Sequence, residues 1–103
     1  MAQDITAIMA FVTTNDYNQL DQQQQVKLIA KLTNLYDGAT LTEHMGGYMM
    51  ADGDLAIEYS YTIELFGLST NQYNSAIRTL KDLGKMNGQE SIIINGDFIY
   101  LNK

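Results

Sequence analysis

The chain has 103 residues, no cysteine, one histidine (His44) and a net charge of −6. This length fits one domain, 1–103, and the missing cysteines exclude disulfides and thiolate metal sites. No apolar run reaches the roughly 18 residues that span a bilayer, and the first residues include an acid where a secretion signal carries basic residues. We therefore expect a cytoplasmic protein of one domain, with no metal and no cofactor.

The charge is distributed unevenly along the chain. Residues 1–66 contain two lysines against nine acidic residues, a net charge of −7, whereas residues 67–103 contain four basic residues against three acids, a net charge of +1. Acidic surfaces repel nucleic acid, and phosphate contacts require lysine or arginine. Any DNA contact is therefore expected from the C-terminal third, and the acidic remainder suits solubility or a protein partner.

Two helices are expected within residues 1–37. Asp4 caps the first helix, which the turn-forming residues 13–16 end. Its apolar residues follow helical spacing: Ile5, Ile8, Met9 and Val12. The second helix begins near Asp16 or Asp21, carries Gln22–Gln25 on a solvated face, and ends at Asp37-Gly38 with the glycine in the left-handed position. Its apolar stripe is Leu28, Ile29, Leu32, Leu35 and Tyr36.

Residues 39–51 are harder to interpret. Thr40 or Thr42 could cap a short helix, although the pair Gly46-Gly47 in its middle costs about 1 kcal/mol for each glycine. Asp52-Gly53-Asp54 is expected to be a turn. It is not a calcium loop, because its acids lack the spacing of that motif.

Residues 55–66 fit two periodicities. Alternation from Ile57 to Leu65 is typical of a strand, whereas Leu55, Tyr59, Ile63 and Phe66 have helical spacing. We expect a short strand near Ala56–Tyr59, followed by a helix that ends at Phe66.

Residues 69–84 carry the clearest helix signals. Ser69 and Gln72 form a capping box, and Leu68 with Tyr73 forms the matching hydrophobic staple. Gly84 is expected to end the helix. The buried stripe is Tyr73, Ala76, Ile77, Leu80 and Leu83.

A β-hairpin is expected over residues 91–101. Two β-rich runs flank Asn95-Gly96, and both of these residues accept the positive φ of a type I′ turn. Because two strands alone are marginally stable in water, the hairpin must pack on the helices.

The order of helix, Gly-x-Ser turn, capped helix and hairpin is that of winged helix-turn-helix proteins. Residues 60–86 resemble the core of that family, and the chain resembles most the N-terminal DNA-binding domains of plasmid and phage replication initiators and small repressors. The resemblance implies a mainly α fold with a small β-hairpin, with the helix-turn-helix at 54–86 and the wing at 90–102. Ile63 stands where the family has a small residue, and the wing tip Asn95-Gly96-Asp97 has no basic residue.

In that family the second motif helix enters the major groove of DNA. The resemblance therefore implies a sequence-specific transcriptional regulator or replication accessory that binds double-stranded DNA as a homodimer. The DNA-binding residues that it implies are Thr70, Asn71, Gln72, Asn74, Ser75, Arg78, Lys81 and Lys85. The alternative is an acidic winged-helix inhibitor or adaptor that contacts a nucleic-acid-binding protein.

No residue pattern predicts catalysis. Glu43-His44 lacks a second histidine or cysteine to complete a metal or acid–base site, so His44 is interpreted as a surface residue. Methionines 45, 49 and 50 are expected to fill gaps in the core rather than line a binding surface. Tyrosines 48, 59 and 61 are assigned to packing rather than to a stacking platform for single strands. The sequence alone favours a protein that is not an enzyme.

Overall fold

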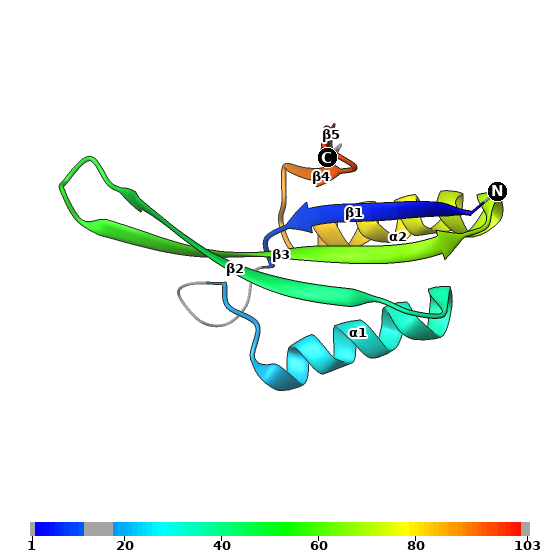
Figure 1. Cartoon of the computed structure of the whole chain (residues 1–103). Helices are drawn as coiled ribbons and strands as arrows, with labels where there is room; N and C mark the ends of the chain where they lie inside the picture. The colour runs from blue at the N-terminus through cyan, green and yellow to red at the C-terminus, as the bar shows by residue number, and fades with distance from the viewer. Residues whose placement is uncertain (1, 12–17, 102–103) are drawn as a thin grey trace.

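The computed structural model describes residues 2–11 and 18–101 of the chain. Its elements are β1 (Gln3–Met9), α1 (Gln22–Tyr36), β2 (Thr40–Met49), β3 (Leu55–Leu68), α2 (Thr70–Met86), β4 (Ser91–Ile94) and β5 (Asp97–Tyr100). The strands form one antiparallel sheet in the order β2-β3-β1-β4-β5 (Figure 1). The first six elements run β-α-β-β-α-β, and β1 lies between β3 and β4, which is the ferredoxin-like arrangement.

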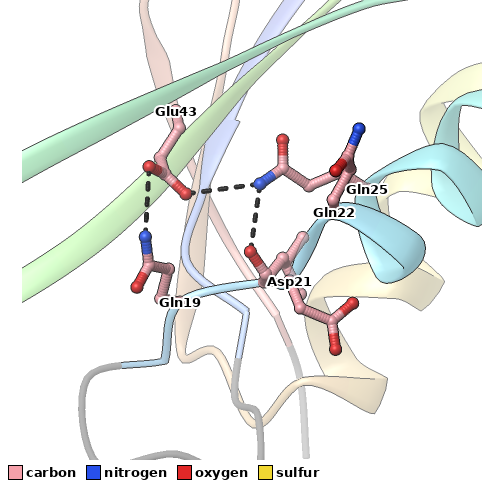
Figure 2. Close-up of a pocket in the computed structure, with 6 residues that line it drawn as sticks. Gln19, Asp21, Gln22, Gln25 and Glu43 are labelled. Carbon is pink, nitrogen blue, oxygen red and sulfur yellow. Dashed lines mark hydrogen bonds between the residues drawn. The ribbon is translucent and has the colours of Figure 1, made fainter.

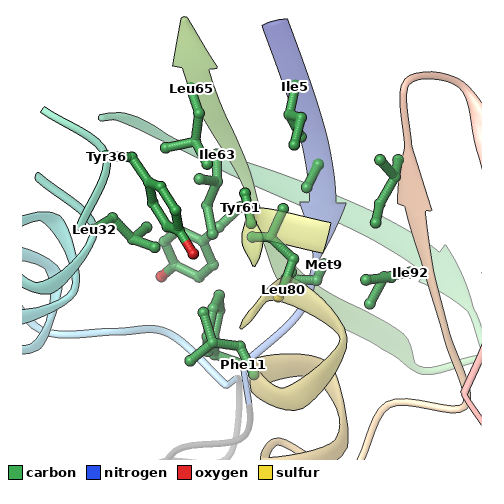
Figure 3. Close-up of a cluster of buried hydrophobic side chains, with 14 of the residues drawn as sticks. Ile5, Met9, Phe11, Leu32, Tyr36, Tyr61, Ile63, Leu65, Leu80 and Ile92 are labelled. Atoms are coloured by element: carbon green, nitrogen blue, oxygen red, sulfur yellow. The ribbon is translucent and has the colours of Figure 1, made fainter. Parts of the chain in front are cut away.

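Both helices pack against one face of the sheet and enclose the core. The hydroxyl of Tyr36, at the end of α1, is hydrogen-bonded to Ser75 (3.1 Å) and Thr79 (2.8 Å) of α2, which ties the two helices together. Figure 3 shows the buried side chains between the helices and the strands. The largest of those that are fully buried are Tyr61, Ile5, Leu32, Ile63, Leu65, Leu68, Leu80 and Ile92.

The first expected helix is wrong, because residues 3–9 form strand β1 at the centre of the sheet. The buried residues of this segment alternate: Ile5, Ala7 and Met9, with Phe11 continuing the pattern. The helical interpretation ignored Ala7, whose small side chain completes the two-residue period. Val12 and the expected turn at 13–16 lie outside the described residues.

The expected helices over 40–49 and 60–66 are also wrong. These segments are β2 and β3, paired from Thr40↔Glu64 to Met49↔Leu55. Burial on β3 alternates, since Tyr61, Ile63 and Leu65 are buried and the two residues between them are half-buried. The two-residue period of a strand therefore describes this segment, and the helical period does not. The expected turn at Asp52-Gly53-Asp54 is confirmed, and Gly53 has a φ of 89°.

Helix α1 has a capping box of its own, in which the Asp21 side chain accepts from the backbone of Gln24. Its end differs in detail from the expectation, since Asp37 and not Gly38 takes the left-handed conformation, with a φ of 66°. Leu32 and Tyr36 are buried as expected, whereas Leu35 is exposed.

Helix α2 and the C-terminal hairpin are confirmed. The Ser69–Gln72 capping box is present, and β4 pairs with β5 across Asn95-Gly96, which have φ angles of 51° and 85°. Gly84 does not end α2, which continues to Met86. A Cβ on Gly84 would lie 2.7 Å from Leu101 Cδ1 and 2.9 Å from Ile92 Cγ2, so this glycine permits close packing of the helix on the hairpin.

The mainly α, winged helix-turn-helix fold is therefore wrong. The position of the first motif helix is occupied by β3, a central strand, and more of the described residues lie in strands than in helices. The segment assigned as a wing pairs with β1 and extends the same sheet. Among residues 2–11 and 18–101, neither helix is long and apolar enough to cross a membrane.

Candidate functional site

A pocket of about 330 Å³ lies between β2 and the start of α1. Its size is at the lower end of the roughly 300–1,000 Å³ of small-molecule sites. Polar residues predominate among those that line it: Gln19, Leu20, Asp21, Gln22, Gln25 and Glu43. We take this pocket as the candidate functional site.

The carboxylate of Glu43 is the acceptor on which the hydrogen bonds of the pocket converge (Figure 2). Tyr61 donates to Oε1 at 2.7 Å, and the side-chain amide of Gln25 approaches the same oxygen at 3.4 Å. The amide of Gln19 approaches Oε2, also at 3.4 Å. Three neutral donors thus hold the carboxylate of Glu43 in a defined position, and the residue is exposed to solvent.

Tyr61 sets the direction of this network. Its hydroxyl accepts from the backbone N–H of Leu20 at 2.7 Å, and an amide N–H can only donate. The phenol proton is therefore directed at Glu43. Burial, together with the hydrogen bond to Glu43, raises the pKa of Tyr61 to about 12, so the phenol stays protonated near neutral pH. Its ring packs edge to face on Phe11, with centroids 5.8 Å apart.

The segment before α1 is fixed to the sheet, which makes the pocket preformed. Asn18 exchanges two hydrogen bonds with the backbone of Tyr59, at 3.0 and 3.3 Å. The Gln25 amide also donates to the carbonyl of Leu20 at 3.0 Å. With the capping box at Asp21, these bonds hold both ends of the segment and reduce the ordering needed on binding.

The sequence-based interpretation missed the two central residues of this site. Glu43 was considered only with His44, whose ring instead bonds Thr62 Oγ1 at 2.7 Å on the opposite face of the sheet. Tyr61 was assigned to packing alone. The signal that could have found them is symmetry, because Glu43 and Tyr61 are each nine positions from Asp52. A hairpin centred on the turn at Asp52 therefore pairs them, as the register shows.

The residues expected to bind DNA all lie on α2, away from this pocket. Gln72 caps the helix, and Ser75 is hydrogen-bonded to Tyr36, so their side chains have structural roles. Those that are exposed are Thr70, Asn71, Asn74, Arg78 and Lys85, while Lys81 is half-buried. DNA contact by these residues stays a prediction, and the helix-turn-helix that was to present them is absent from the described residues.

A second pocket, of about 470 Å³, lies at the start of α2 and is lined by Ala2, Gly67, Ser69, Thr70 and Gln72. Ser69 and Gln72 already satisfy each other in the capping box. We therefore do not assign a function to this pocket.

No protein family and no curated protein matches the chain. The solved structures that are similar to it include two of a phage SAM lyase. A phage SAM lyase in complex with S-methyl-5′-thioadenosine has a TM-score of 0.55 and 22% identity, covering 88% of this chain and 77% of its own. A phage SAM lyase in the apo state has a TM-score of 0.55 and 24% identity, covering 90% and 78%. At this identity, the likeness shows a shared fold.

These similarities correct the functional expectations. The chain shares its fold with solved structures of an enzyme, and this fold differs from that of a winged-helix regulator. The predictions of a DNA-binding regulator, of an acidic winged-helix inhibitor or adaptor, and of a protein that is not an enzyme are therefore contradicted.

Proposed function

We propose that this chain is an enzyme that cleaves S-adenosylmethionine (SAM) and releases S-methyl-5′-thioadenosine, as a SAM lyase. Two observations support the proposal. The chain shares its fold with phage SAM lyases over 88–90% of its length. It also holds a carboxylate, Glu43, in a preformed pocket.

The chemistry of SAM suits an acidic site. SAM carries a sulfonium and an ammonium group, and both positive charges are absent from S-methyl-5′-thioadenosine. When the bond between the sulfur and the amino-acid side chain breaks, the sulfur keeps the electron pair and becomes a neutral thioether. The side-chain carbon that loses this bond gains a new one from the carboxylate oxygen of the same fragment, which leaves as a lactone. An acidic surface attracts the cationic substrate and releases the neutral product. The net charge of −6 and the two acids of the pocket, Asp21 and Glu43, match this difference.

We assign Glu43 as the charge partner of the cationic part of SAM. Tyr61 and Gln25 are positioning residues, because they act through the carboxylate of Glu43. Tyr61 serves as a donor and not as a base, since its raised pKa keeps the phenol protonated. The expected cytoplasmic location is part of this proposal, because a small charged substrate would reach the pocket from solution.

The observation that carries the proposal is the orientation of the Glu43 carboxylate by Tyr61 in a chain with this fold. The test is incubation of the purified chain with SAM, followed by mass spectrometry for S-methyl-5′-thioadenosine. Glu43→Gln is expected to weaken SAM binding about tenfold or more, as for loss of a charged hydrogen-bonding partner. Binding of the neutral product should change little.

Glu64→Gln is the matched control, because Glu64 is half-buried on β3 and does not line the pocket. It should bind and cleave SAM as the unmodified chain does. Absence of product from the unmodified chain would contradict the proposed activity. Equal weakening of SAM and product binding by Glu43→Gln would contradict the role given to its charge.

A further inference from the structure

The hairpin of β2 and β3 extends beyond both helices, as Figure 1 shows at the left. We call residues 45–58 the β2–β3 arm. Exposed large apolar side chains gather on it, between 48% and 68% exposed: Met45, Tyr48, Met49, Met50 and Leu55. The methionines expected to fill the core are thus on the surface. A cluster of exposed apolar side chains of this kind is typical of a surface that contacts another molecule.

One face of the arm continues the core. Side chains alternate along a strand, so Met45 and Met49 lie on the same face of β2 as Leu41, which packs on the core. On this face, Leu55 and Ile57 flank Gly47, since a Cβ on Gly47 would lie 3.4 and 3.5 Å from their Cδ1 atoms. The helices that cover the face elsewhere end before the arm (Figure 1). The arm therefore presents an apolar sheet surface without its own helix.

The charge of the arm restricts what can cover it. Residues 45–58 contain Asp52, Asp54 and Glu58 and no lysine or arginine. Nucleic acid and anionic membranes would be repelled. Two arms packed face to face would bring six carboxylates together, which like-charge repulsion disfavours.

The complementary surface is on α2 of the same chain. Arg78, Lys81 and Lys85 lie three and four residues apart, so they form one stripe on the helix, with Asp82 as an acid beside it. Met86 follows at the end of α2 and is 77% exposed. Lysine and arginine side chains cover apolar surface with their stems while their charges meet acids.

We propose that the β2–β3 arm of one copy of this chain packs on the C-terminal half of α2 of a second copy. The apolar face of the arm, with Met45, Met49 and Leu55, lies against Met86 and the stems of the basic stripe. The acids of the turn at the tip of the arm, Asp52 and Asp54, lie near Arg78, Lys81 and Lys85. In the smallest assembly, a dimer, each arm covers the α2 of its partner; the same contact also closes into larger rings. The expected homodimer is thereby given a specific interface.

Sedimentation velocity over a range of protein concentrations and salt concentrations tests this contact. Self-association is expected at low salt and should weaken as salt rises, because the Debye length falls from about 10 Å at 0.1 M to about 3 Å at 1 M. Association that strengthens with salt would instead indicate arm-to-arm packing and overturn the proposal. So would a monomer at every concentration in low salt.

A charge swap makes the test specific to the two surfaces. Asp52→Lys/Asp54→Lys reverses the charge of the arm, and Lys81→Glu/Lys85→Glu reverses the charge of the helix stripe. For each variant alone, the dissociation constant of self-association should rise about tenfold or more. An equal mixture of the two should recover association, because the reversed arm of one meets the reversed stripe of the other. Failure of the mixture to recover would overturn the proposal.

The apolar part of the contact is tested by Met45→Ser/Met49→Ser, with Val26→Ser as the matched control. Val26 is an exposed apolar residue of α1 outside both surfaces. The arm variant should lose association and keep the melting temperature, whereas the control should keep both. Equal association of the two variants would overturn the proposal. Because none of these experiments measures SAM cleavage, their failure is distinct from failure of the proposed activity.

Discussion

Strand β3 passes through two environments. Towards its C-terminal end, Tyr61, Ile63 and Leu65 are fully buried beneath the helices, whereas at its N-terminal end Leu55 is 63% exposed on the arm. Apolar and polar residues alternate from Ile57 to Leu65, across both environments. The difference is therefore one of coverage, not of residue type. Substitutions under the helices should change the free energy of unfolding, and the same substitutions on the arm should not.

The largest contrast is expected for Leu80→Ala on α2 against Leu55→Ala on the arm. Leu80 is fully buried, so its truncation should lower the free energy of unfolding by about 2–5 kcal/mol. In salt high enough to keep the chain monomeric, the arm substitution should change it by less than about 0.5 kcal/mol. Urea denaturation of both variants measures the difference. Ile77→Ala should fall between them, because Ile77 is only half-buried. Equal losses at Leu80 and Leu55 would remove the distinction between the two regions.

Tyr61→Phe against Tyr48→Phe tests a polar contact in the same way. Loss of the Tyr61 hydroxyl leaves the buried N–H of Leu20 without its acceptor and Glu43 without its shortest donor. The expected loss of stability is about 1–3 kcal/mol, with weaker SAM binding. Tyr48 is exposed on the arm, and its variant should match the unmodified chain in both assays. No change at Tyr61 would show that the hydroxyl does not hold the pocket.

Glycine to alanine gives a smaller contrast. At Gly84 the added methyl would collide with Leu101 and Ile92, which costs about 1–3 kcal/mol and exceeds the gain of about 1 kcal/mol in helix propensity. At Gly46, on the arm, nothing lies within 4 Å of the added methyl. Thermal denaturation should show a lower melting temperature for Gly84→Ala and none of this loss for Gly46→Ala. A stabilised Gly84→Ala would mean that the helix and hairpin are less closely packed.

The last contrast appears only at alkaline pH. The pKa of Tyr61 is raised by burial from 10.0 to about 12, so the folded state binds this proton more tightly than the unfolded state. The stability that it contributes is complete below pH 10 and is lost as the pH rises towards 12. Tyr61→Phe should therefore lose less stability than the unmodified chain over this interval. Tyr48→Phe should lose as much as the unmodified chain. An identical decline in the stability of all three proteins would contradict the raised pKa assigned to Tyr61.

The sequence predicted well those elements whose signals are local. The start of α2 follows from Ser69 and Gln72, and the hairpin follows from Asn95-Gly96, because capping and turn geometry depend on neighbouring residues. The end of α2, expected at Gly84, lies at Met86. The site was not predictable in this way. Glu43 and Tyr61 lie 18 residues apart, and Gln25 comes from a polar run with no distinguishing feature.

By itself, the sequence determined a cysteine-free, acidic chain with two capped helices and a C-terminal hairpin. Only the tertiary structure decided that residues 3–9 and 60–66 are strands. Their apolar residues fit both a two-residue and a helical period, and local propensity could not choose between them. Pairing with β1, β2 and β4 settled the choice, because strands gain their stability from partners distant in the chain. The same pairing placed Tyr61 beside Glu43 on the neighbouring strand. It also extended the arm beyond the helices that cover the rest of the sheet (Figure 1).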